Sequence, residues 1–255
     1  MDLDIRGRSA VITGASKGIG RAVAERLAAE GVNVYLVART VTALETAASE
    51  LKDRYGVDVG FSALDLSVSS NVDQLFADYS GTVDILVNNA GAIPGGSIDR
   101  VDETTWRQAW DLKVFGYINM CRLAYDRMRN VGHGVIINII GAAGERPSPG
   151  YIAGSGGNAS LMAITRGLGG HSLSDGIRVV AINPGLIRTE RLVTILKAQA
   201  EESLGDESRW EELVDPVFAP GDPQHIADLA AFLASGLSGN TTGTVFTVDG
   251  GSSAR

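Results

Sequence analysis

The segment Thr13-Gly14-Ala15-Ser16-Lys17-Gly18-Ile19-Gly20 is the most informative part of this 255-residue chain. It follows a β-rich run, Ser9–Thr13, and leads into Ile19–Ala29, whose apolar residues recur at helical spacing. Glycines in such a loop let the backbone pass close to a pyrophosphate group. The start of the helix adds unpaired N–H groups and the positive end of the helix dipole. This strand–loop–helix context predicts a dinucleotide-binding site at residues 14–20.

Short apolar runs and helical patterns alternate along the rest of the chain in the same way. The predicted strands are Ser9–Thr13, Val32–Val37, Asp58–Leu64, Ile85–Val87, Val135–Ile140, Ile177–Ile182 and Thr244–Val248. The predicted helices are Ile19–Ala29, Val41–Leu51, Asn71–Tyr79, Thr104–Met128, Ile152–Gly169 and Ile226–Leu233. Aliphatic strands without polar alternation, placed between helices, are typical of a parallel sheet that is covered on both faces.

Because strand crossovers are right-handed, a doubly wound sheet is the simplest topology for this pattern. We find no linker and no internal repeat, so we expect one α/β domain over residues 1–255, of Rossmann type, with about seven parallel strands. Residues 189–216 interrupt the alternation with an amphipathic stretch and an acidic continuation that contains Trp210. This segment follows the carboxyl end of a strand, where open α/β sheets bind ligands, and we expect a substrate lid. A surface helical excursion or an oligomer contact is the alternative.

Composition narrows the possible partners. The formal net charge of −8 argues against nucleic acid or an anionic membrane as the main partner. Cys121 is the single cysteine, so no internal disulfide can form, which fits a reducing cytoplasm. The sequence begins without a secretory signal pattern and contains no apolar run long enough for a membrane span. The three histidines lack metal-ligand spacing, and no metal is expected. We therefore expect a soluble, cytoplasmic protein.

The end of the second predicted strand indicates which cofactor binds. It reads Leu36-Val37-Ala38-Arg39. An acidic residue at this point would bind the adenosine ribose hydroxyls and favour NAD, whereas an arginine accommodates a 2′-phosphate. Ala38 stands where the acid is expected, Arg39 follows it, and Lys17 supplies a second cation. The pattern favours NADP(H) over NAD(H). The alternative is that both cations are merely solvated.

With these motifs in view, the sequence resembles the short-chain dehydrogenase/reductase family over essentially its whole length. The loop Thr13–Gly20 resembles the TGxxxGxG motif of that family. The other matching segments are Asp65-Leu66, Asn88-Asn89-Ala90-Gly91, Asn183-Pro184-Gly185 with Ile187 and Thr189, Thr242-Gly243 and Val248–Gly251. The resemblance implies that these segments, from Asp65 and Leu66 to Ile187 and Thr189, line the cofactor. It also implies hydride transfer between a nicotinamide and a carbonyl or alcohol, and assembly through the two longest helices as a homodimer or homotetramer.

In this family a Tyr acts as acid and base, a Lys lowers the pKa of that Tyr and holds the ribose, and a Ser positions the substrate oxygen. Alignment of Asn138–Gly141 and of Ala159–Arg166 with the family pattern places Gly141 at the Ser, Gly154 at the Tyr and Asn158 at the Lys. Asn158 can still bond a ribose hydroxyl, but it has no charge. Lys113 stands at the position of a supporting Asn. Each of these family residues is therefore replaced in this chain.

Two side chains are candidate replacements. Tyr151 lies three residues before Gly154, and its hydroxyl could reach the space that the glycine opens. Lys113 faces the same region if the alignment holds. A nearby cation lowers the pKa of a phenol, so the two together could rebuild the acid. The alternative is that Tyr151 forms a wall of the substrate pocket and that Lys113 extends to solvent.

Three functions remain open from the sequence. The first is an NADP(H)-dependent oxidoreductase with a non-standard proton donor, acting on an unknown small carbonyl or alcohol. Proximity and orientation contribute much of the catalysis of hydride transfer, so such an enzyme remains feasible. The second is a non-redox isomerase or lyase on the same fold. The third is a cofactor-binding protein without catalysis, such as a sensor or a partner subunit.

Overall fold

The computed structural model describes residues 2–254, without the side chains of residues 198, 199, 202 and 218. One sheet has the strand order β3-β2-β1-β4-β5-β6-β7, and every neighbouring pair is parallel. The strands are β1 (Ser9–Thr13), β2 (Asn33–Ala38), β3 (Val59–Ala63), β4 (Ile85–Asn88), β5 (Gly134–Ile139), β6 (Ile177–Pro184) and β7 (Val245–Val248). The strand order reverses between β1 and β4, so the predicted doubly wound, single-domain α/β fold is confirmed.

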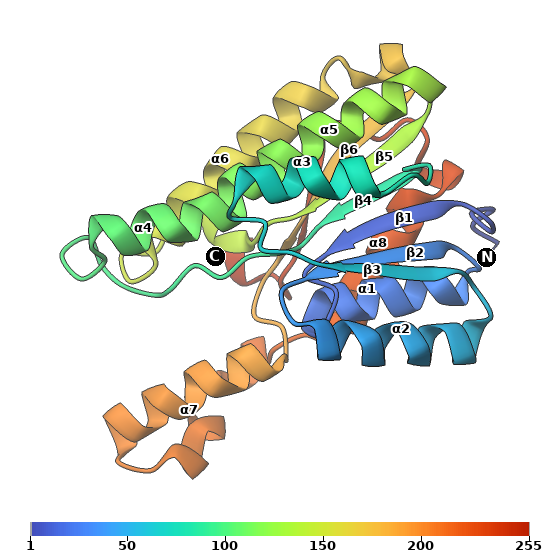
Figure 1. Ribbon diagram of the computed structural model, residues 1–255. Helices are drawn as coiled ribbons and strands as arrows, with labels where there is room; N and C mark the ends of the chain where they lie inside the picture. The colour runs from blue at the N-terminus through green and yellow to red at the C-terminus, as the bar shows by residue number, and fades with distance from the viewer. Residues whose placement is uncertain (1, 255) are drawn as a thin grey trace.

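The main helices are α1 (Gly18–Ala29), α2 (Val41–Tyr55), α3 (Ser69–Asp78), α4 (Glu103–Trp110), α5 (Gly116–Val131), α6 (Ile152–Gly169), α7 (Glu190–Leu204) and α8 (Pro223–Ala234). Helices α1, α2 and α8 cover one face of the sheet, and α3, α5 and α6 cover the other (Figure 1). Each layer buries an aliphatic cluster against the strands. The strands β4, β5 and β6 are buried along their whole length, as expected for a sheet covered on both faces.

The segment predicted as one long helix, Thr104–Met128, contains a break. Helix α4 ends at Trp110, a π-helical turn spans Asp111–Phe115, and α5 begins at Gly116. Gly116 packs tightly here, since a Cβ on it would lie 3.2 Å from the carbonyl oxygen of Leu66. A π turn adds a residue and changes which side chains face inward, and such turns are frequent at functional sites. This turn carries Lys113.

The predicted excursion after β6 is also seen as helical structure. Helix α7 is followed by two 3-10 segments, η4 (Glu207–Leu213) and η5 (Pro216–Phe218), and α7 projects away from the sheet (Figure 1). Two backbone hydrogen bonds join the two ends of the excursion at its base. Arg188 N donates to Gly221 O at 2.8 Å, and Gly221 N donates to Leu186 O at 2.9 Å. Leu196 and Ala200 are buried within the excursion.

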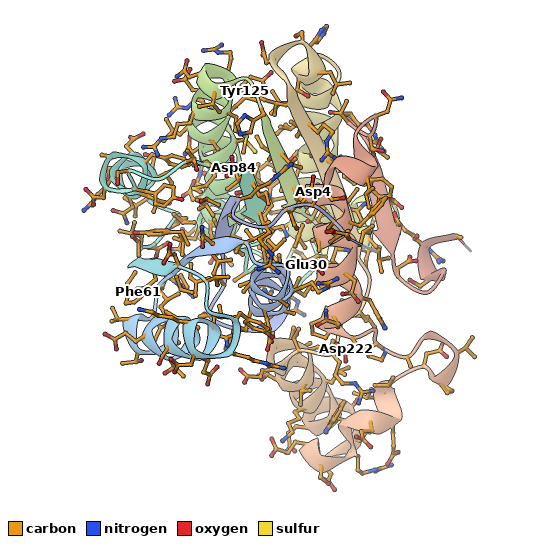
Figure 2. The ribbon with its side chains drawn as sticks, turned by 90° about the vertical axis from the view of Figure 1, so that its right-hand side faces the viewer. Asp4, Glu30, Phe61, Asp84, Tyr125 and Asp222 are labelled. Carbon is orange, nitrogen blue, oxygen red and sulfur yellow. The ribbon has the colours of Figure 1, made fainter. Side chains whose placement is uncertain are left out.

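At the opposite, amino edge of the sheet, polar side chains connect the strand starts. Asp84 lies there (Figure 2), and its carboxylate accepts from Ser9 N at 2.8 Å and contacts His133 Nε2 at 2.9 Å. Asp222, also labelled in Figure 2, caps α8 by accepting from Gln224 N at 2.8 Å. The contacts of Asp84 hold the framework on the side away from the motif residues, whereas Asp222 directly follows Gly221 at the base of the excursion. Within the described part of the chain, no helix is long and apolar enough to cross a membrane.

Candidate functional site

The loop between β1 and α1 is joined to the end of β4. The Thr13 hydroxyl accepts backbone N–H bonds from Asn89 and Ala90 at 2.9 and 3.0 Å. The Asn89 amide nitrogen donates to the carbonyl oxygens of Thr13 and Gly14 at 3.1 and 3.2 Å. Two motifs that are far apart in the sequence therefore form one unit at the carboxyl edge of the sheet.

The backbone of this loop requires glycine at three positions. Gly14 and Gly18 have φ values of +66° and +58°, which favour glycine. A Cβ on Gly20 would lie 2.4 Å from Gly14 O, so the loop requires glycine at this position as well. The N-cap residue of α1, Lys17, makes no side-chain capping bond, so the first N–H groups of the helix have no side-chain partner. Such a helix start fits a phosphate group.

The residue after β2 is a free cation. The side chain of Arg39 is exposed and makes no hydrogen bond or ion pair with any residue that the structure describes. The pKa of Asp65, after β3, is lowered mainly by bonds from the N–H and hydroxyl of Ser67, at 3.0 and 2.8 Å, and less by the charge of Arg39. Leu66, beside it, is buried. Arg39 and Asp65 thus lie near each other, next to the phosphate loop.

Lys17 and Thr189 connect the phosphate loop with the excursion. Lys17 Nζ lies 3.3 Å from Glu190 Oε2, and both side chains are largely exposed. A Cβ on Gly18 would lie 3.4 Å from Thr189 Cγ2. The Thr189 hydroxyl in turn caps α7 by accepting from Leu192 N at 3.3 Å. The phosphate loop and the segment after β6, which are far apart in the sequence, therefore meet at the carboxyl edge of the sheet.

The segment after β6 is held close to the last strand. Pro184 ends β6, and a Cβ on Gly185 would lie 2.6 Å from Cβ of Asp249. Ile187 is buried and forms an isolated bridge with Gly221. This close packing fixes the main chain of residues 184–189, which connects the end of β6 to the start of α7.

The end of β5 has a backbone that favours glycine. Gly141 has φ of +147° and donates its N–H to Asn183 Oδ1 at 3.4 Å. The Asn183 amide nitrogen then donates to Glu145 at 2.8 Å, and Glu145 also accepts from the Thr247 hydroxyl at 2.7 Å. The carboxylate of Glu145 thus ties β6 and β7 to the loop after β5.

Asn158 on α6 faces this glycine. A Cβ on Gly141 would lie 2.8 Å from Asn158 Nδ2. The residue is 3% exposed, and its Oδ1 has no hydrogen-bond partner among the described residues. An unpaired buried amide oxygen is uncommon and favours a donor from outside the protein. A ribose hydroxyl is a donor of that kind, so Asn158 fits the cofactor contact that was predicted for it.

The ring of Tyr151 covers Gly154. A Cβ on Gly154 would lie 2.1 Å from both Cε1 and Cζ of Tyr151. The ring packs with Trp106 and Trp110 in a small apolar cluster that also contains Ile93. Burial raises the pKa of Tyr151, and the charge of Arg191 opposes this shift. Its hydroxyl has no hydrogen-bond partner in the part of the chain that the structure describes.

Trp110 packs on the same side of α6 as Tyr151, over the glycines that follow Gly154. Its indole Nε1 donates to the carbonyl oxygen of Ala153 at 2.9 Å. Cβ atoms on Gly156 and Gly157 would lie 3.5 and 3.3 Å from the indole ring. The first turns of α6 therefore present glycines, and aromatic side chains from other positions pack over them.

Lys113, in the π turn, lies at the end of β5. Its Nζ donates to Ile140 O at 2.7 Å and to Ile139 O at 3.3 Å, and its stem covers Gly91. Tyr117 lies beneath, with its ring centre 5.3 Å from Nζ. Burial, with a smaller contribution from the charge of Arg191, lowers the pKa of Lys113 from 10.5 to about 7. This amine can therefore take up and release a proton near neutral pH.

Arg191, in the first turn of α7, is the cation that influences both candidates, and the sequence analysis had not selected it. Its Nη1 donates to Gly91 O at 3.0 Å and its Nη2 to Ile93 O at 2.8 Å. An arginine two residues after the Thr189 motif was a possible signal. Sequence alone, however, does not place it beside residues 91–93.

Comparison with known proteins agrees with this geometry. A family model described as short chain dehydrogenase matches residues 8–200. The 3-oxoacyl-(acyl-carrier-protein) reductase FabG of Chlamydia muridarum is 34% identical over 248 residues, covering 96% of each chain. L-Sorbose reductase of Gluconobacter frateurii, solved with NADPH and L-sorbose, has a TM-score of 0.91 at 33% identity and 98% coverage of each chain. A 7α-hydroxysteroid dehydrogenase, solved with NADH and 7-oxo glycochenodeoxycholic acid, has a TM-score of 0.85 at 27% identity, covering 98% of this chain and 96% of that one.

The fold and the phosphate loop define a nucleotide-binding oxidoreductase of the Rossmann type. This chain belongs to the short chain dehydrogenase family. The resemblance stated from the motifs is thereby confirmed at the level of the family.

Proposed function

We propose that this chain is an NADP(H)-dependent oxidoreductase that interconverts a small carbonyl compound and its alcohol with a non-standard proton donor. The observation that carries the proposal is Lys113, an amine whose pKa is about 7, which donates to the carbonyl oxygen of Ile140, next to Gly141, and whose stem covers Gly91. A general acid works best when its pKa lies near the working pH.

The proposed cofactor is NADP(H). Arg39 stands exposed, with no hydrogen bond or ion pair to the residues that the structure describes, as expected of a side chain that binds a 2′-phosphate. The NADPH complex of L-sorbose reductase supports this choice, although the 7α-hydroxysteroid dehydrogenase complex contains NADH. The residues proposed to hold the cofactor are Gly14, Ala15, Ser16, Lys17, Gly18, Ile19, Gly20, Arg39, Asp65, Leu66, Asn89, Ala90, Gly91, Asn158, Pro184, Gly185, Ile187 and Thr189.

The family's Ser, Tyr and Lys positions are proposed to be Gly141, Gly154 and Asn158. Gly141 and Gly154 cannot move a proton, and Asn158 carries no charge. The proton therefore comes from Lys113, whose ammonium gives it to the substrate oxygen and is left neutral. The hydride that reduces the carbonyl carbon is supplied by NADPH, which becomes NADP⁺.

Tyr151 is proposed to position the substrate. Burial raises the pKa of its phenol, so the hydroxyl stays protonated and can donate a hydrogen bond at neutral pH. Because Lys113 is absent from the charges that shift Tyr151, the phenol is the weaker candidate for the proton donor.

The test compares Lys113→Met with Tyr151→Phe. Cofactor binding is followed by nicotinamide fluorescence, and reduction of a panel of carbonyl compounds by nicotinamide absorbance. We expect Lys113→Met to bind NADPH and to lose about 10²- to 10⁴-fold in kcat. We expect Tyr151→Phe to lose less, mainly through a higher KM. The reverse order would make Tyr151 the donor. Tight NADPH binding without any turnover would favour the sensor, partner-subunit or non-redox alternatives.

Residues 189–216 are proposed to act as the substrate lid. The excursion begins at the phosphate loop, is closed at its base and extends away from the sheet (Figure 1). A lid of this kind would exclude water during the reaction. Limited proteolysis within residues 200–216, with and without NADPH and substrate, tests it: protection by ligands is expected.

We also propose that the chain forms a homodimer or homotetramer through α4, α5 and α6. A hollow of about 590 Å³ opens beside α4 and the π turn, and Phe115 is 52% exposed there. The residues that line this hollow are Glu103, Trp106, Arg107, Trp110, Asp111 and Phe115. A two-fold contact would bury the same surface on both copies. Sedimentation of wild type and Phe115→Asp tests this, with dissociation of the variant expected.

A further inference from the structure

Arg191 is fixed in place and still has free donors. Its two terminal nitrogens each give one hydrogen to a carbonyl oxygen, of Gly91 and of Ile93. A guanidinium has five N–H donors, so the Nε–H and one hydrogen on each terminal nitrogen have no protein partner among the described residues. The residue is exposed, which leaves those donors open to a ligand.

Lys113 approaches the same glycine from the other side. A Cβ on Gly91 would lie 2.5 Å from Lys113 Cδ, while Gly91 O accepts from Arg191. The Lys113 ammonium is bonded only to carbonyl oxygens. Two cations from different elements thus converge on residues 91–93, at the carboxyl edge of the sheet.

Among the residues that the structure describes, no carboxylate lies within ion-pair distance of either cation. Glu190, next to Arg191 in α7, is paired with Lys17. Glu145, beyond β5, is engaged by Asn183 and Thr247. Asp111, in the same π turn as Lys113, lines the outer hollow beside α4. The other titratable groups that face Lys113 and Arg191 are phenols, those of Tyr117 and Tyr151.

We propose that the substrate is a small oxo acid or hydroxy acid, and that its carboxylate pairs with the guanidinium of Arg191. An arginine binds a carboxylate with two parallel hydrogen bonds, which fixes orientation as well as affinity. The proposal rests on the proposed oxidoreductase function and adds the class of substrate to it. Arg191 would be a specificity-determining residue of that site.

A cofactor phosphate is the other anion that Arg191 could bind. Two observations favour the substrate side. Arg191 is bonded to Ile93, which lies in the apolar cluster with Tyr151, and its charge influences the phenol of Tyr151. The phosphate loop, by contrast, is reached by Lys17, Thr189 and the start of α1.

Binding of a carboxylate would also act on Lys113. Offsetting the charge of Arg191 removes a repulsion that now helps to lower the pKa of Lys113 to about 7. The pKa of Lys113 should therefore rise when the acid binds. At a pH just above 7 the complex should take up protons, which prepares the ammonium to protonate the substrate oxygen.

The test measures binding of pyruvate, 2-oxobutanoate and 4-oxopentanoate, each beside its uncharged methyl ester. Calorimetry is run on the full chain saturated with NADP⁺, in buffers of different ionisation enthalpy, so that proton uptake is measured directly. The variant is Arg191→Gln. The matched control is Arg188→Gln, which removes the same charge from an exposed side chain that has no side-chain partner in the described structure.

We expect at least one acid to bind more tightly than its ester, with proton uptake, and Arg191→Gln to weaken this acid about 10- to 100-fold. Ester binding and NADPH affinity should change little, and Arg188→Gln should resemble wild type. Acids that bind no better than esters, or an Arg191→Gln variant that keeps acid binding, would overturn the proposal. Loss of NADPH affinity in Arg191→Gln would assign the residue to a cofactor phosphate and also overturn it. Acid binding without any oxidation of NADPH, when the same acids are mixed with the NADPH-loaded chain and nicotinamide absorbance is followed, would sink the proposed oxidoreductase function while leaving the anion site standing.

Discussion

The phenol ring of Tyr151 lies where a side chain on Gly154 would begin, with two ring carbons 2.1 Å from the position of a Cβ. The two residues are one helical turn apart at the start of α6. Any side chain on Gly154 must displace the ring, and the ring can lie there only because residue 154 is glycine. The two positions are therefore coupled, and a larger side chain cannot be placed at position 154 without moving Tyr151.

The first prediction concerns this coupling. Gly154→Ala should lower the free energy of unfolding by about 1–3 kcal/mol, because the methyl group overlaps the ring. In a Tyr151→Ala background the same change should stabilise by up to about 1 kcal/mol, because alanine is the better helix former. Denaturant unfolding of the four chains gives the coupling energy.

Gly167→Ala is the matched control in the same helix. A Cβ on Gly167 has nothing within 4 Å, so this substitution should stabilise by about 0.5–1 kcal/mol in both backgrounds. Equal effects of Gly154→Ala with and without the ring would contradict the proposed packing of Tyr151.

The second prediction concerns pH and stability through Lys113. Its pKa is lowered on folding, so between about 7 and 10.5 the unfolded chain holds a proton that the folded chain has released. The free energy of unfolding rises with pH wherever the unfolded state binds more protons. Burial of the charged Lys113 therefore lowers the free energy of unfolding by its full amount below pH 7. This destabilisation disappears as the pH rises toward 10.5.

Lys113→Met removes this titration. We expect the variant to be more stable than wild type at about pH 6.5, with the difference shrinking at about pH 9.5. Urea unfolding at both pH values measures it, and the difference between the chains cancels the other titrating groups. A difference that does not depend on pH would mean that Lys113 has an ordinary pKa.

The third prediction concerns Arg39. Arg39→Gln should weaken NADPH binding about 10-fold or more and leave NADH binding nearly unchanged, because only NADPH has the 2′-phosphate. Fluorescence titration measures both. Lys52→Gln, on the exposed side of α2, is the control for the loss of one positive charge. Equal losses for both cofactors would argue against a phosphate contact at Arg39.

The fourth prediction uses two glycines with the same backbone. Gly18 and Gly56 have φ of +58° and +66°, so replacing either by Ala should cost about 1 kcal/mol of stability. Only Gly18 lies in the phosphate loop, where its methyl group would also face Thr189 Cγ2 at 3.4 Å. Gly18→Ala should therefore lose cofactor affinity, and Gly56→Ala should keep it. Thermal unfolding with and without NADPH reports both effects.

The local sequence pattern was sufficient to predict the fold and to locate the segments that are expected to bind the cofactor. The strands β1 and β5 and the helix α6 follow the apolar runs closely, because buried parallel strands and covering helices need those periods. The family motifs are short and local, so the phosphate loop could be found from residues 13–20 alone. The π turn around Lys113 was not visible, because the apolar residues of 104–128 keep a helical spacing through it.

What the sequence alone determined about this protein is the doubly wound fold, the family, asparagine at position 158 and glycines at positions 141 and 154. Only the tertiary structure decided what takes up the space that these glycines leave. The ring of Tyr151 packs over Gly154, and Arg191 reaches residues 91–93 from a distant part of the chain. These contacts depend on side-chain direction and on packing between distant segments, and neither leaves a periodic pattern in the sequence. The near-neutral pKa of Lys113 follows from burial and from Arg191, and so it too exists only in the folded chain.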